Sequence, residues 1–323
     1  MTTLAMFHPT HLVASELREV LDRRRELWQK MHLLSNREQE IGTLTEVRGE
    51  AAVVAAVDDS SFDGVDVAFF FGPAADYAPL LQNLPDTTTA VVVGQEPSYG
   101  DGLPVVSGLN LDQVSTTSTL LSPHPAVIAG ALLLQRWATL KPVRWSATVL
   151  QPASVFGNDG LDELLEQTRA MLNFQTRDED SPLPSDLAFN VFQNPDGVDG
   201  ILGPLGTLMS DHLQQPCELS CQVLQTSVFH GFGIAMQVEF AQDPGEDALA
   251  QALEDHPSID LDVPPHGFGP KQAVAQDKMM VGTPNLIRPG VYSLWTSLDN
   301  LTVGGAANLM AILEALSPQL TEN

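Results

Sequence analysis

Two kinds of nucleophile are present in this sequence, cysteine thiols and a serine with a histidine close by. The thiols belong to Cys217 and Cys221, four residues apart in a segment predicted to be a β-strand. At about 3.3 Å per residue they are separated by roughly 13 Å, too far for a disulfide. A cysteine in an apolar strand is usually buried and unreactive, so we expect both thiols to be reduced and inert.

A Ser-His-Asp catalytic set is a second possibility. Ser122, His124 and Asp159 supply the residue types, but no G-x-S-x-G sequence accompanies them. That sequence makes the sharp turn on which hydrolases expose their serine. We therefore do not expect hydrolase chemistry here.

The charge of the chain restricts its partners. The formal net charge is −26 over 323 residues, and seven of the 15 basic residues precede Ala51. An acidic surface repels nucleic acid and anionic membranes, and it also disfavours phosphorylated or dinucleotide ligands unless basic residues cluster locally. The acidic runs Asp178–Asp180 and Glu254–Asp262 and the basic run Arg23–Arg25 are predicted to be solvated surfaces. With no signal peptide and no apolar run of about 18 residues, a cytoplasmic protein is expected.

The pattern of apolar segments predicts a parallel α/β sheet in the first third of the chain and a mixture of helices and strands after it. Alternating short apolar runs and an amphipathic segment in the first third predict a parallel α/β sheet. Its strands are expected at Leu4–Phe7, Ala51–Val57, Val65–Phe71, Ala90–Val93 and Pro104–Val106, with a helix over Val13–Met31. Later helices are expected at Pro125–Leu140, Leu161–Leu172, Glu246–Ala252 and Gly304–Leu316, and strands at Cys217–Phe229, Ile234–Phe240 and Tyr292–Ser297. The turn His230–Gly233 predicts that the first two of these strands pair as a hairpin.

One segment near the C-terminus resembles a known family. Residues 299–308 are D-N-L-T-V-G-G-A-A-N, similar to the D-N-L-x-K-G-A-A-x-N segment of aspartate-semialdehyde dehydrogenases. In the same order as in that family, Phe62–Phe69 resembles F-E-G-V-D-I-A-L-F, Leu187–Val191 resembles I-A-F-N, and Val228–Glu239 resembles the strands that carry the catalytic histidine. The divergent Usg-like branch is the nearest comparison. The resemblance implies a Rossmann-type domain over residues 1–139 with 300–323, and an α+β dimerisation domain over residues 140–299.

The family's cofactor loop is altered in this sequence. The family has G-A-T-G-A-V-G, whose glycines allow a tight turn and close approach to the cofactor phosphates. Here the loop runs from His8 to Ala14 and includes Pro9 and His11 but no glycine. The loop D-N-T-S-x-F-R, which also binds phosphate, corresponds to residues 94–99 and contains no arginine. We therefore expect no cofactor, neither NADP nor NAD.

The resemblance places other residues at the family's catalytic positions. Pro125 stands at the nucleophile cysteine, Phe232 at the basic histidine, and Gln225 at the arginine that pairs with the substrate carboxylate. A proline cannot form the thioester that this chemistry requires. The matches that remain in the family's active-site loops are Gln151, Ser154, Gly157 and Asn308.

Histidines occupy several of the altered loops. His8 and His11 lie in the cofactor loop, His124 in the nucleophile loop and His230 two residues before the base position. In the family fold these loops converge, so the four imidazoles would suit a divalent metal. We favour separate loop histidines, because no H-E-x-x-H or similar spacing is present.

Three functional hypotheses follow. The favoured one is a pseudoenzyme kept as a dimeric scaffold, a partner subunit or a sensor, with a homodimer as its assembly and hetero-association with an active paralogue as a further possibility. The alternative is an NAD(P)-dependent oxidoreductase of amino-acid biosynthesis with a rebuilt site. The third is metal-dependent chemistry at the histidines.

Overall fold

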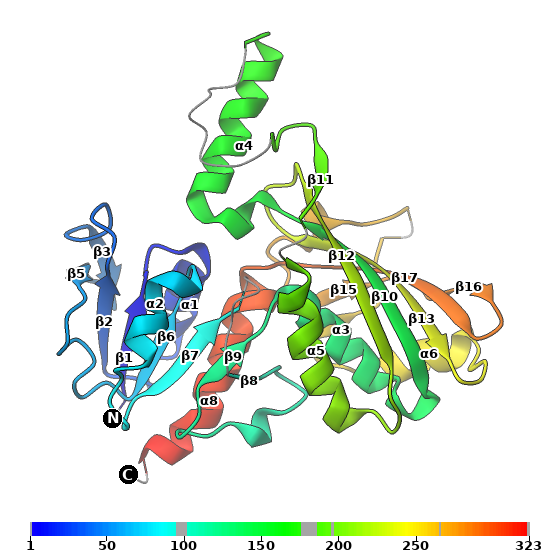
Figure 1. Cartoon of the computed structure of the whole chain (residues 1–323), viewed down its shortest axis with the longest axis horizontal. Coiled ribbons are helices and arrows are strands. Elements are labelled where there is room, and N and C mark those ends of the chain that lie inside the picture. The colour runs from blue at the N-terminus through cyan, green and yellow to red at the C-terminus, as the bar shows by residue number, and fades with distance from the viewer. Residues whose placement is uncertain (1, 95–101, 176–185, 195–196, 265, 322–323) are drawn as a thin grey trace. The chain divides into compact units, whose positions relative to one another are not determined.

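The structure is a computed structural model that describes residues 2–94, 102–175, 186–194, 197–264 and 266–321 (Figure 1). It divides into two compact units, Met1–His124 with Gly305–Asn323, and Pro125–Gly304. The helix predicted from Pro125 therefore falls in unit 2. The expected domain boundary at residues 139 and 140 stays a prediction, because a grouping by contacts does not test which segments fold as domains.

Unit 1 is built on a parallel sheet in the order β5-β2-β1-β6-β7-β9-β8. Its strands are β1 (Thr3–Phe7), β2 (Lys30–Ser35), β5 (Ala55–Ala56), β6 (Val67–Phe70), β7 (Thr89–Val93), β8 (Leu103–Pro104) and β9 (Leu120–Ser122). The helices are α1 (Leu12–Arg23), α2 (Ala74–Leu81), the 3₁₀ turn η1 (Leu111–Gln113) and α8 (Ala307–Thr321), which follows the π-helical turn Thr302–Ala306. The central strands β6 and β7 are buried at every position because both faces of a parallel sheet are covered.

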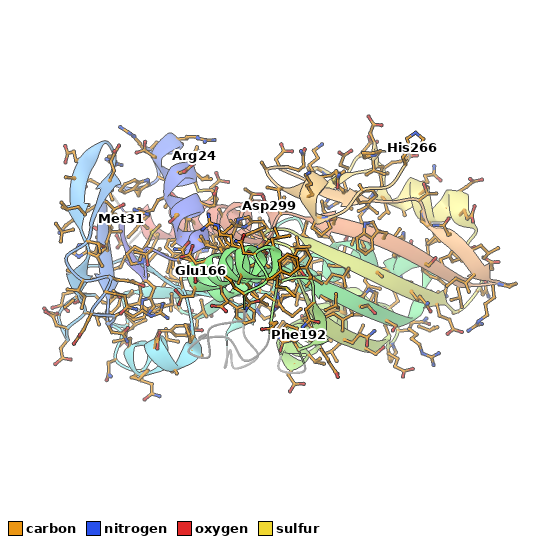
Figure 2. All side chains as sticks on the ribbon, turned by 90° about the horizontal axis from the view of Figure 1, so that it is seen from above. Arg24, Met31, Glu166, Phe192, His266 and Asp299 are labelled. Carbon is orange, nitrogen blue, oxygen red and sulfur yellow. The ribbon has the colours of Figure 1, made fainter. Side chains whose placement is uncertain are left out.

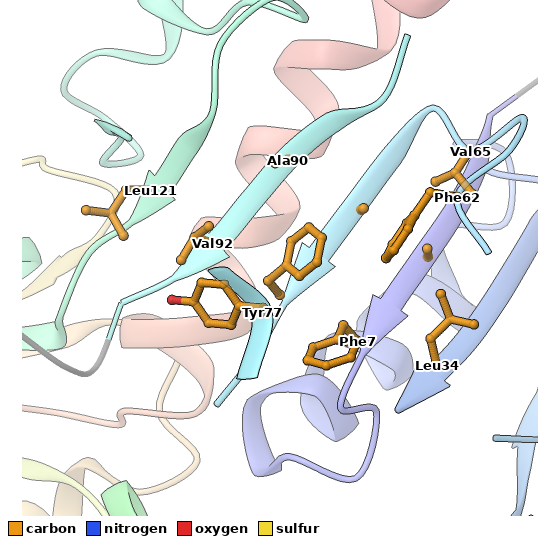
Figure 3. Packing of buried hydrophobic residues seen from close by; sticks show 11 residues of the cluster. Phe7, Leu34, Phe62, Val65, Tyr77, Ala90, Val92 and Leu121 are labelled. Atoms are coloured by element: carbon orange, nitrogen blue, oxygen red, sulfur yellow. The ribbon is translucent and has the colours of Figure 1, made fainter. Parts of the chain in front are cut away.

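One core cluster of unit 1 is aromatic (Figure 3). The ring of Phe70 lies 6.0 Å from that of Phe7 and 5.7 Å from those of Phe62 and Tyr77, between ring centroids. These tilted contacts lie in the range that aromatic pairs prefer. They join β1 and β6 to α2 and fix the carboxyl ends of both strands.

Two predictions in this unit were wrong. The helix expected over Val13–Met31 ends at Arg23, and β2 begins at Lys30. Trp28 continues the apolar pattern of the helix from a loop: its indole is buried and donates to the carbonyl of Leu21 at 3.0 Å. The strand expected over Ala51–Val57 is divided, since β4 (Glu50–Val53) pairs with β3 (Leu44–Val47) in a hairpin and only β5 joins the sheet.

Unit 2 is built on a mixed sheet in the order β11-β12-β10-β13-β17-β15-β14, with β16 also paired to β17. The strands are β10 (Pro142–Gln151), β11 (Val191–Gln193), β12 (Glu218–Thr226), β13 (Phe232–Phe240), β14 (Ile259–Asp260), β15 (Met279–Val281), β16 (Asn285–Arg288) and β17 (Val291–Leu298). The expected pairing of β12 with β13 was wrong, because β10 lies between them, parallel to β12 and antiparallel to β13. Trp145, Ala147 and Val149 of β10 are buried, which suits a central strand.

The helices of unit 2 differ in what they contact, since those that begin at Pro125 and Asp199 pack on the apolar face of the sheet, whereas the one that begins at Gly157 packs on the 3₁₀ turn before it. They are α3 (Pro125–Arg136), α4 (Gly157–Leu172), α5 (Asp199–His212), α6 (Glu246–Leu253) and α7 (Pro270–Ala273), with 3₁₀ turns at Ala138–Leu140 and Ala153–Phe156. A β-carbon at Gly130 of α3 would lie 3.3 Å from Leu205 of α5 and from Trp145, so glycine permits this close approach.

The other sheet face is polar. Ser146, Thr148 and Gln237 lie on it, whereas Ile234 and Val238 are buried within the unit. In the sequence, the case for a homodimer rests on the apolar residues of Leu219–Phe229 and Ile234–Phe240. Burial of Ile234 and Val238 within the unit accounts for part of that pattern, and the dimer stays a prediction. In the described part of the chain, every helix is too short or too polar to cross a membrane.

Asn308 connects α8 to the sheet of unit 1. Its Oδ1 accepts from Ser107 N at 2.7 Å, and its Nδ2 donates to Val105 O and to Ser122 Oγ, each at 2.9 Å. Asn308→Ala should lower the free energy of unfolding by roughly 2–4 kcal/mol, because buried polar groups lose their partners. Urea denaturation measures this change.

Asn83→Ala is the matched control for this prediction. Asn83 is exposed and makes one local bond, to Pro79 O at 3.0 Å, so its loss should cost less than about 0.5 kcal/mol. Equal costs for the two variants would contradict the structural importance of Asn308.

Candidate functional site

The loop that follows β1 is held by a buried histidine. His8 has a left-handed backbone, with φ of 59°, and its side chain is buried. Its Nδ1 lies 3.2 Å from Glu40 Oε2 and 3.1 Å from Ser35 Oγ, and its Nε2 lies 3.3 Å from Asp76 Oδ2. Both ring nitrogens therefore face side chains of the protein.

Glu40 places a carboxylate beside the start of α1. Burial raises the pKa of this carboxyl, but hydrogen bonds from His8, Ser35 and Thr10 outweigh burial and lower the pKa to about 2. A helix N-terminus favours an anion, because its first N–H groups and dipole are positive. The loop thus contains an anion that belongs to the protein itself.

Arg37 is the arginine that pairs with this carboxylate. Its guanidinium lies 2.8 Å from Asp76 Oδ2 and 3.6 Å from Glu40 Oε1. One positive charge is thus set against two carboxylates. In doubly wound folds an arginine after the second strand can accept a 2′-phosphate, but here the protein's own acids already engage it.

His11 is the residue that caps α1. Its Nδ1 accepts from Val13 N at 3.2 Å, its carbonyl accepts from Ser15 N at 3.0 Å, and its ring stacks on Phe71 at 5.6 Å between centroids. Burial, with the nearby His8 and Arg37, lowers the pKa of His11 to about 4. Ala14, the last residue of the loop, is buried in the first turn of α1. The N–H of Val13 is therefore already satisfied by the chain.

Pro125 opens α3 at the position where the resemblance expected a nucleophile. Proline suits the first turn of a helix, since its missing N–H would have no partner in the helix there. The residue is buried, and a β-carbon added to Gly304 would lie 2.7 Å from Pro125 Cβ. The pyrrolidine ring is therefore packed as part of the core of unit 2. His124, the last residue of the first segment of unit 1, is buried as well.

Gln225 and Gln151 form a buried amide pair. Gln151 Nε2 donates to Gln225 Oε1 at 3.1 Å, and Gln225 Nε2 donates to the carbonyl of Gln151 at 3.1 Å. The hydroxyl of Thr226 donates to the same carbonyl at 3.0 Å. Both residues are uncharged, so this pair has no cation for a substrate carboxylate.

Asn300 ties three segments of unit 2 together. Its Oδ1 accepts from Gly231 N at 2.9 Å, and its Nδ2 donates to Ser154 Oγ at 3.1 Å. Phe232, next to Gly231, is fully buried. Gly157 begins α4 with φ of 68°, a left-handed conformation that glycine adopts without strain.

The carboxylate of Asp299 accepts hydrogen bonds from backbone N–H groups. Its Oδ1 accepts from Leu301 N at 2.8 Å, and its Oδ2 accepts from Ala275 N at 2.7 Å (labelled in Figure 2). Asp299, Asn300 and Asn308 are the polar residues of the segment 299–308 that match the family motif, and their bonds show what each does in this chain. Their polar atoms hold the fold, and none of these bonds requires a ligand.

The other sequence candidates are each accounted for locally. Ser122 is buried, and its Oγ accepts from Asn308, whereas Asp159 is exposed on α4. Burial raises the pKa of Cys217 and of Cys221 to about 11, so both thiols are protonated at neutral pH.

The histidines do not form a metal centre in the described part of the chain. There, no group of three or more His, Cys, Asp or Glu side chains is placed to hold a metal ion. His8, His11 and His124 belong to unit 1 and His230 to unit 2. Of the loop at residues 94–99, all but Gly94 lies outside the described residues, as does the acidic run Asp178–Asp180.

Glu40, Arg37 and Asp76 were missed in the sequence. Lys30 and Met31 were included in the predicted helix and no strand was expected over Lys30–Ser35, so the residues that follow β2 could not be recognised as lying at a strand end. The alternation in K-M-H-L-L-S was the available signal.

The chain has homologues along its whole length. It is 28% identical to a protein named USG-1 protein homolog from Azotobacter vinelandii, over 98% of each chain. It is 24% identical to an aspartate-semialdehyde dehydrogenase of Rickettsia conorii, over 79% of this chain and 80% of the relative. No protein-family model matches the sequence.

Solved structures share the fold. Aspartate semialdehyde dehydrogenase II from Vibrio cholerae superposes with a TM-score of 0.80, at 21% identity over 98% of each chain. The enzyme from Candida albicans, solved with NADP, gives a TM-score of 0.73 at 13% identity over 99% of each chain. The expected pairing of a parallel Rossmann-type sheet with a second α+β unit is thereby confirmed.

The lowered pKa of His11 predicts a pH dependence of stability. The folded protein holds His11 neutral down to about pH 4, whereas the unfolded chain binds the proton near pH 6.5. Between these values the unfolded state carries more protons, so stability should fall as pH falls, by up to about 1.4 kcal/mol per pH unit. His11→Asn keeps a cap residue and should make this slope shallower in urea titrations.

His266→Asn is the control, since His266 lies exposed on a loop of unit 2. It should leave the slope as in the wild type. If His11→Asn also leaves the slope unchanged between pH 6.5 and pH 4, His11 is not the group responsible.

Proposed function

We propose that this chain, one of the aspartate-semialdehyde dehydrogenase-like proteins by homology and fold, is a non-catalytic member that serves as a dimeric scaffold, partner subunit or sensor. The observation that carries the proposal is the carboxylate of Glu40 beside the start of α1. In a Rossmann-type domain, that place receives the negative charge of the cofactor. In this chain the carboxylate of Glu40 supplies a negative charge at that place.

The loop residues do not suit NADP. A phosphate would meet Glu40 and Asp76 beside the one guanidinium of Arg37, and it would find the Val13 N–H bonded to His11. Burial strengthens repulsion between like charges, because the local dielectric constant is low. Nothing in this loop replaces the glycines that let a backbone approach phosphate closely.

The residues at the substrate positions lead to the same conclusion. Acyl transfer from a semialdehyde requires a thiolate nucleophile, a base and a cation for the substrate carboxylate. Pro125 is packed against Gly304, Phe232 is buried, and Gln225 is bonded to Gln151. Each of the three positions is thus part of the packed interior of its unit.

An oxidoreductase with a rebuilt site is the second candidate. It is favoured by the persistence of Gln151, Ser154 and Gly157 in one segment, and by the NADP bound to the Candida albicans neighbour. The two candidates differ in one measurable property, which is affinity for the nicotinamide cofactor.

Calorimetric titration of the purified protein with NADP and with NAD should give no binding tighter than about 1 mM. The reason is the internal anion together with the lost glycines. An active aspartate-semialdehyde dehydrogenase in the same buffer is the positive control. A dissociation constant in the micromolar range would favour the oxidoreductase instead.

The wild-type protein should not oxidise aspartate semialdehyde in the presence of NADP and phosphate. Pro125→Cys should be equally inactive, because the base and the cofactor loop would still be missing, and residues that act as a unit do not restore activity singly. Absorbance at the NADPH band against a no-enzyme blank measures turnover. Turnover by either protein above the blank refutes the proposal.

A homodimer through unit 2 is part of the proposal. It is argued here from exposed apolar side chains and not from the apolar pattern of β12 and β13. Large apolar side chains are exposed on α4 and on the segment that enters β11, including Leu172, Phe189 and Val191. These two segments lie together, since Gln167 of α4 accepts hydrogen bonds from Leu187 N and Ala188 N. Exposed apolar side chains on neighbouring segments are typical of an interface, and an active paralogue would use the same surface.

Light scattering at micromolar concentration should give twice the chain mass of 34.8 kDa. The double variant Phe189→Asp with Val191→Asp should shift the mass toward the monomer, because the apolar surface becomes charged. Leu286→Asp, at an exposed position of β16, is the control and should not. A wild-type monomer would contradict the dimer without bearing on catalysis.

A further inference from the structure

A cavity of about 410 Å³ lies within unit 1, between α1, the beginning of β2 and the hairpin of β3 and β4. Its size is in the range of cavities that hold small molecules. One wall is Met31 of β2, which Figure 2 labels together with Arg24, a residue just after α1 that does not line the cavity. The homology and the proposed function assign nothing to this cavity.

The lining carries charges of both signs that are not paired with one another. The charged residues are Arg18, Glu19, Asp22, Arg23, Glu46 and Arg48. Asp22 is bonded to Arg25, outside the cavity, at 2.6 Å. Across the described part of the chain, the other five form no ion pair within 4.0 Å.

Among the described residues, Arg18 has no carboxylate within the 4.0 Å of an ion pair, although Glu19 is near enough to act on its charge. Its guanidinium donates to Thr45 Oγ1 at 2.6 Å and to Ser15 Oγ at 3.4 Å, both neutral acceptors. Its Nε is buried without an acceptor in the part of the chain that the structure describes. Burial lowers the pKa of Arg18, and the charge of Glu19 opposes this effect only in part.

Arg48 is held in place at a conformational cost. It occupies the first position of the two-residue turn of the hairpin, with φ of 57°, followed by Gly49 with φ of 81°. Such turns favour asparagine or glycine at that first position, because a left-handed backbone strains other residues. Arg48 nevertheless stacks over Trp28, with 4.1 Å from Cζ to the ring centroid. Its Nε also has no acceptor among the described residues.

The acidic residues lie at the surface of the same cavity. Glu19 and Glu46 are exposed, whereas Arg18 and Arg48 are half-buried. The lining thus offers carboxylates as well as guanidinium groups, so it suits a simple anion less well than a ligand with both charges. A ligand with both charges would place its anionic group at Arg18 and Arg48 and its cationic group at Glu19 and Glu46.

We propose that this cavity is a binding site for a small zwitterion, of which a free α-amino acid is the simplest kind. The carboxylate supplies the ion-pair partner that Arg18 and Arg48 lack among the described residues. The ammonium group pairs with Glu19 or Glu46, and the side chain lies against Trp28 and Met31. The site would give the protein a ligand whether or not it has lost catalysis, so it does not rest on the proposed function.

The test is calorimetric titration of the full-length protein with each of the common L-amino acids and with inorganic phosphate. For the tightest-binding amino acid, two matched compounds follow, the acid that lacks its amino group and the amine that lacks its carboxylate. Each should bind at least about tenfold more weakly, since each loses one charged pair. Binding of the acid alone or of phosphate as tightly as the amino acid would overturn the zwitterion.

Variants of both charges locate the site. Arg18→Gln should weaken binding about tenfold or more, and so should Glu46→Gln, which is exposed on the hairpin and leaves the folded core intact. Arg24→Gln, on the same helix end but outside the cavity, should bind as the wild type does. Thermal denaturation confirms that each variant is folded. Unchanged binding in folded Arg18→Gln or Glu46→Gln, or no amino acid bound below about 10 mM, would refute the proposal.

Discussion

Burial of polar groups at the ends of strands is the constraint on which this structure depends. A side chain removed from water must find its hydrogen-bond partners within the protein, or the fold loses stability. In unit 1 this constraint applies to His8, which Glu40, Ser35 and Asp76 surround. In unit 2 it applies to Gln225, whose amide is bonded to Gln151.

These networks explain why part of the family's sequence pattern persists while the rest is altered. Asp299, Asn300 and Asn308 all use their polar atoms to hold backbone or neighbouring side chains. Without these three side chains, buried backbone and side-chain groups would have no hydrogen-bond partner, so the fold itself requires them. Pro125 and Phe232 are both buried, and the ring of Pro125 is packed close to Gly304.

The same principle distinguishes the loop that follows β1 from the cavity beside α1. Around His8, Arg37 pairs with Asp76 and Glu40, and Nδ1 of His8 is bonded within the chain, so the charges there have partners in the protein itself. Around Arg18, charges of both signs face one cavity and remain apart in the described part of unit 1. An unpaired charge is costly, and a bound molecule of complementary charge is one way to offset that cost.

The sequence by itself determined the fold class, because short apolar runs such as Leu4–Phe7 and Ala90–Val93 had to be buried on both faces of a sheet. It also showed that Pro125 cannot be a nucleophile, because proline has no reactive side chain. It could not give the strand order of unit 2, where β10 lies between β12 and β13, because pairing partners distant in sequence leave no local pattern.

The tertiary structure alone decided where the charges meet. Glu40, Asp76 and His8 are separated by more than thirty residues from one another, and only the parallel register of β1, β2 and β6 brings the ends of their strands together. Likewise, Arg48 reaches Trp28 only because the hairpin of β3 and β4 folds back toward α1. Electrostatic interactions act over a few ångströms in space, whatever the separation along the chain, and for that reason the sequence could not reveal them.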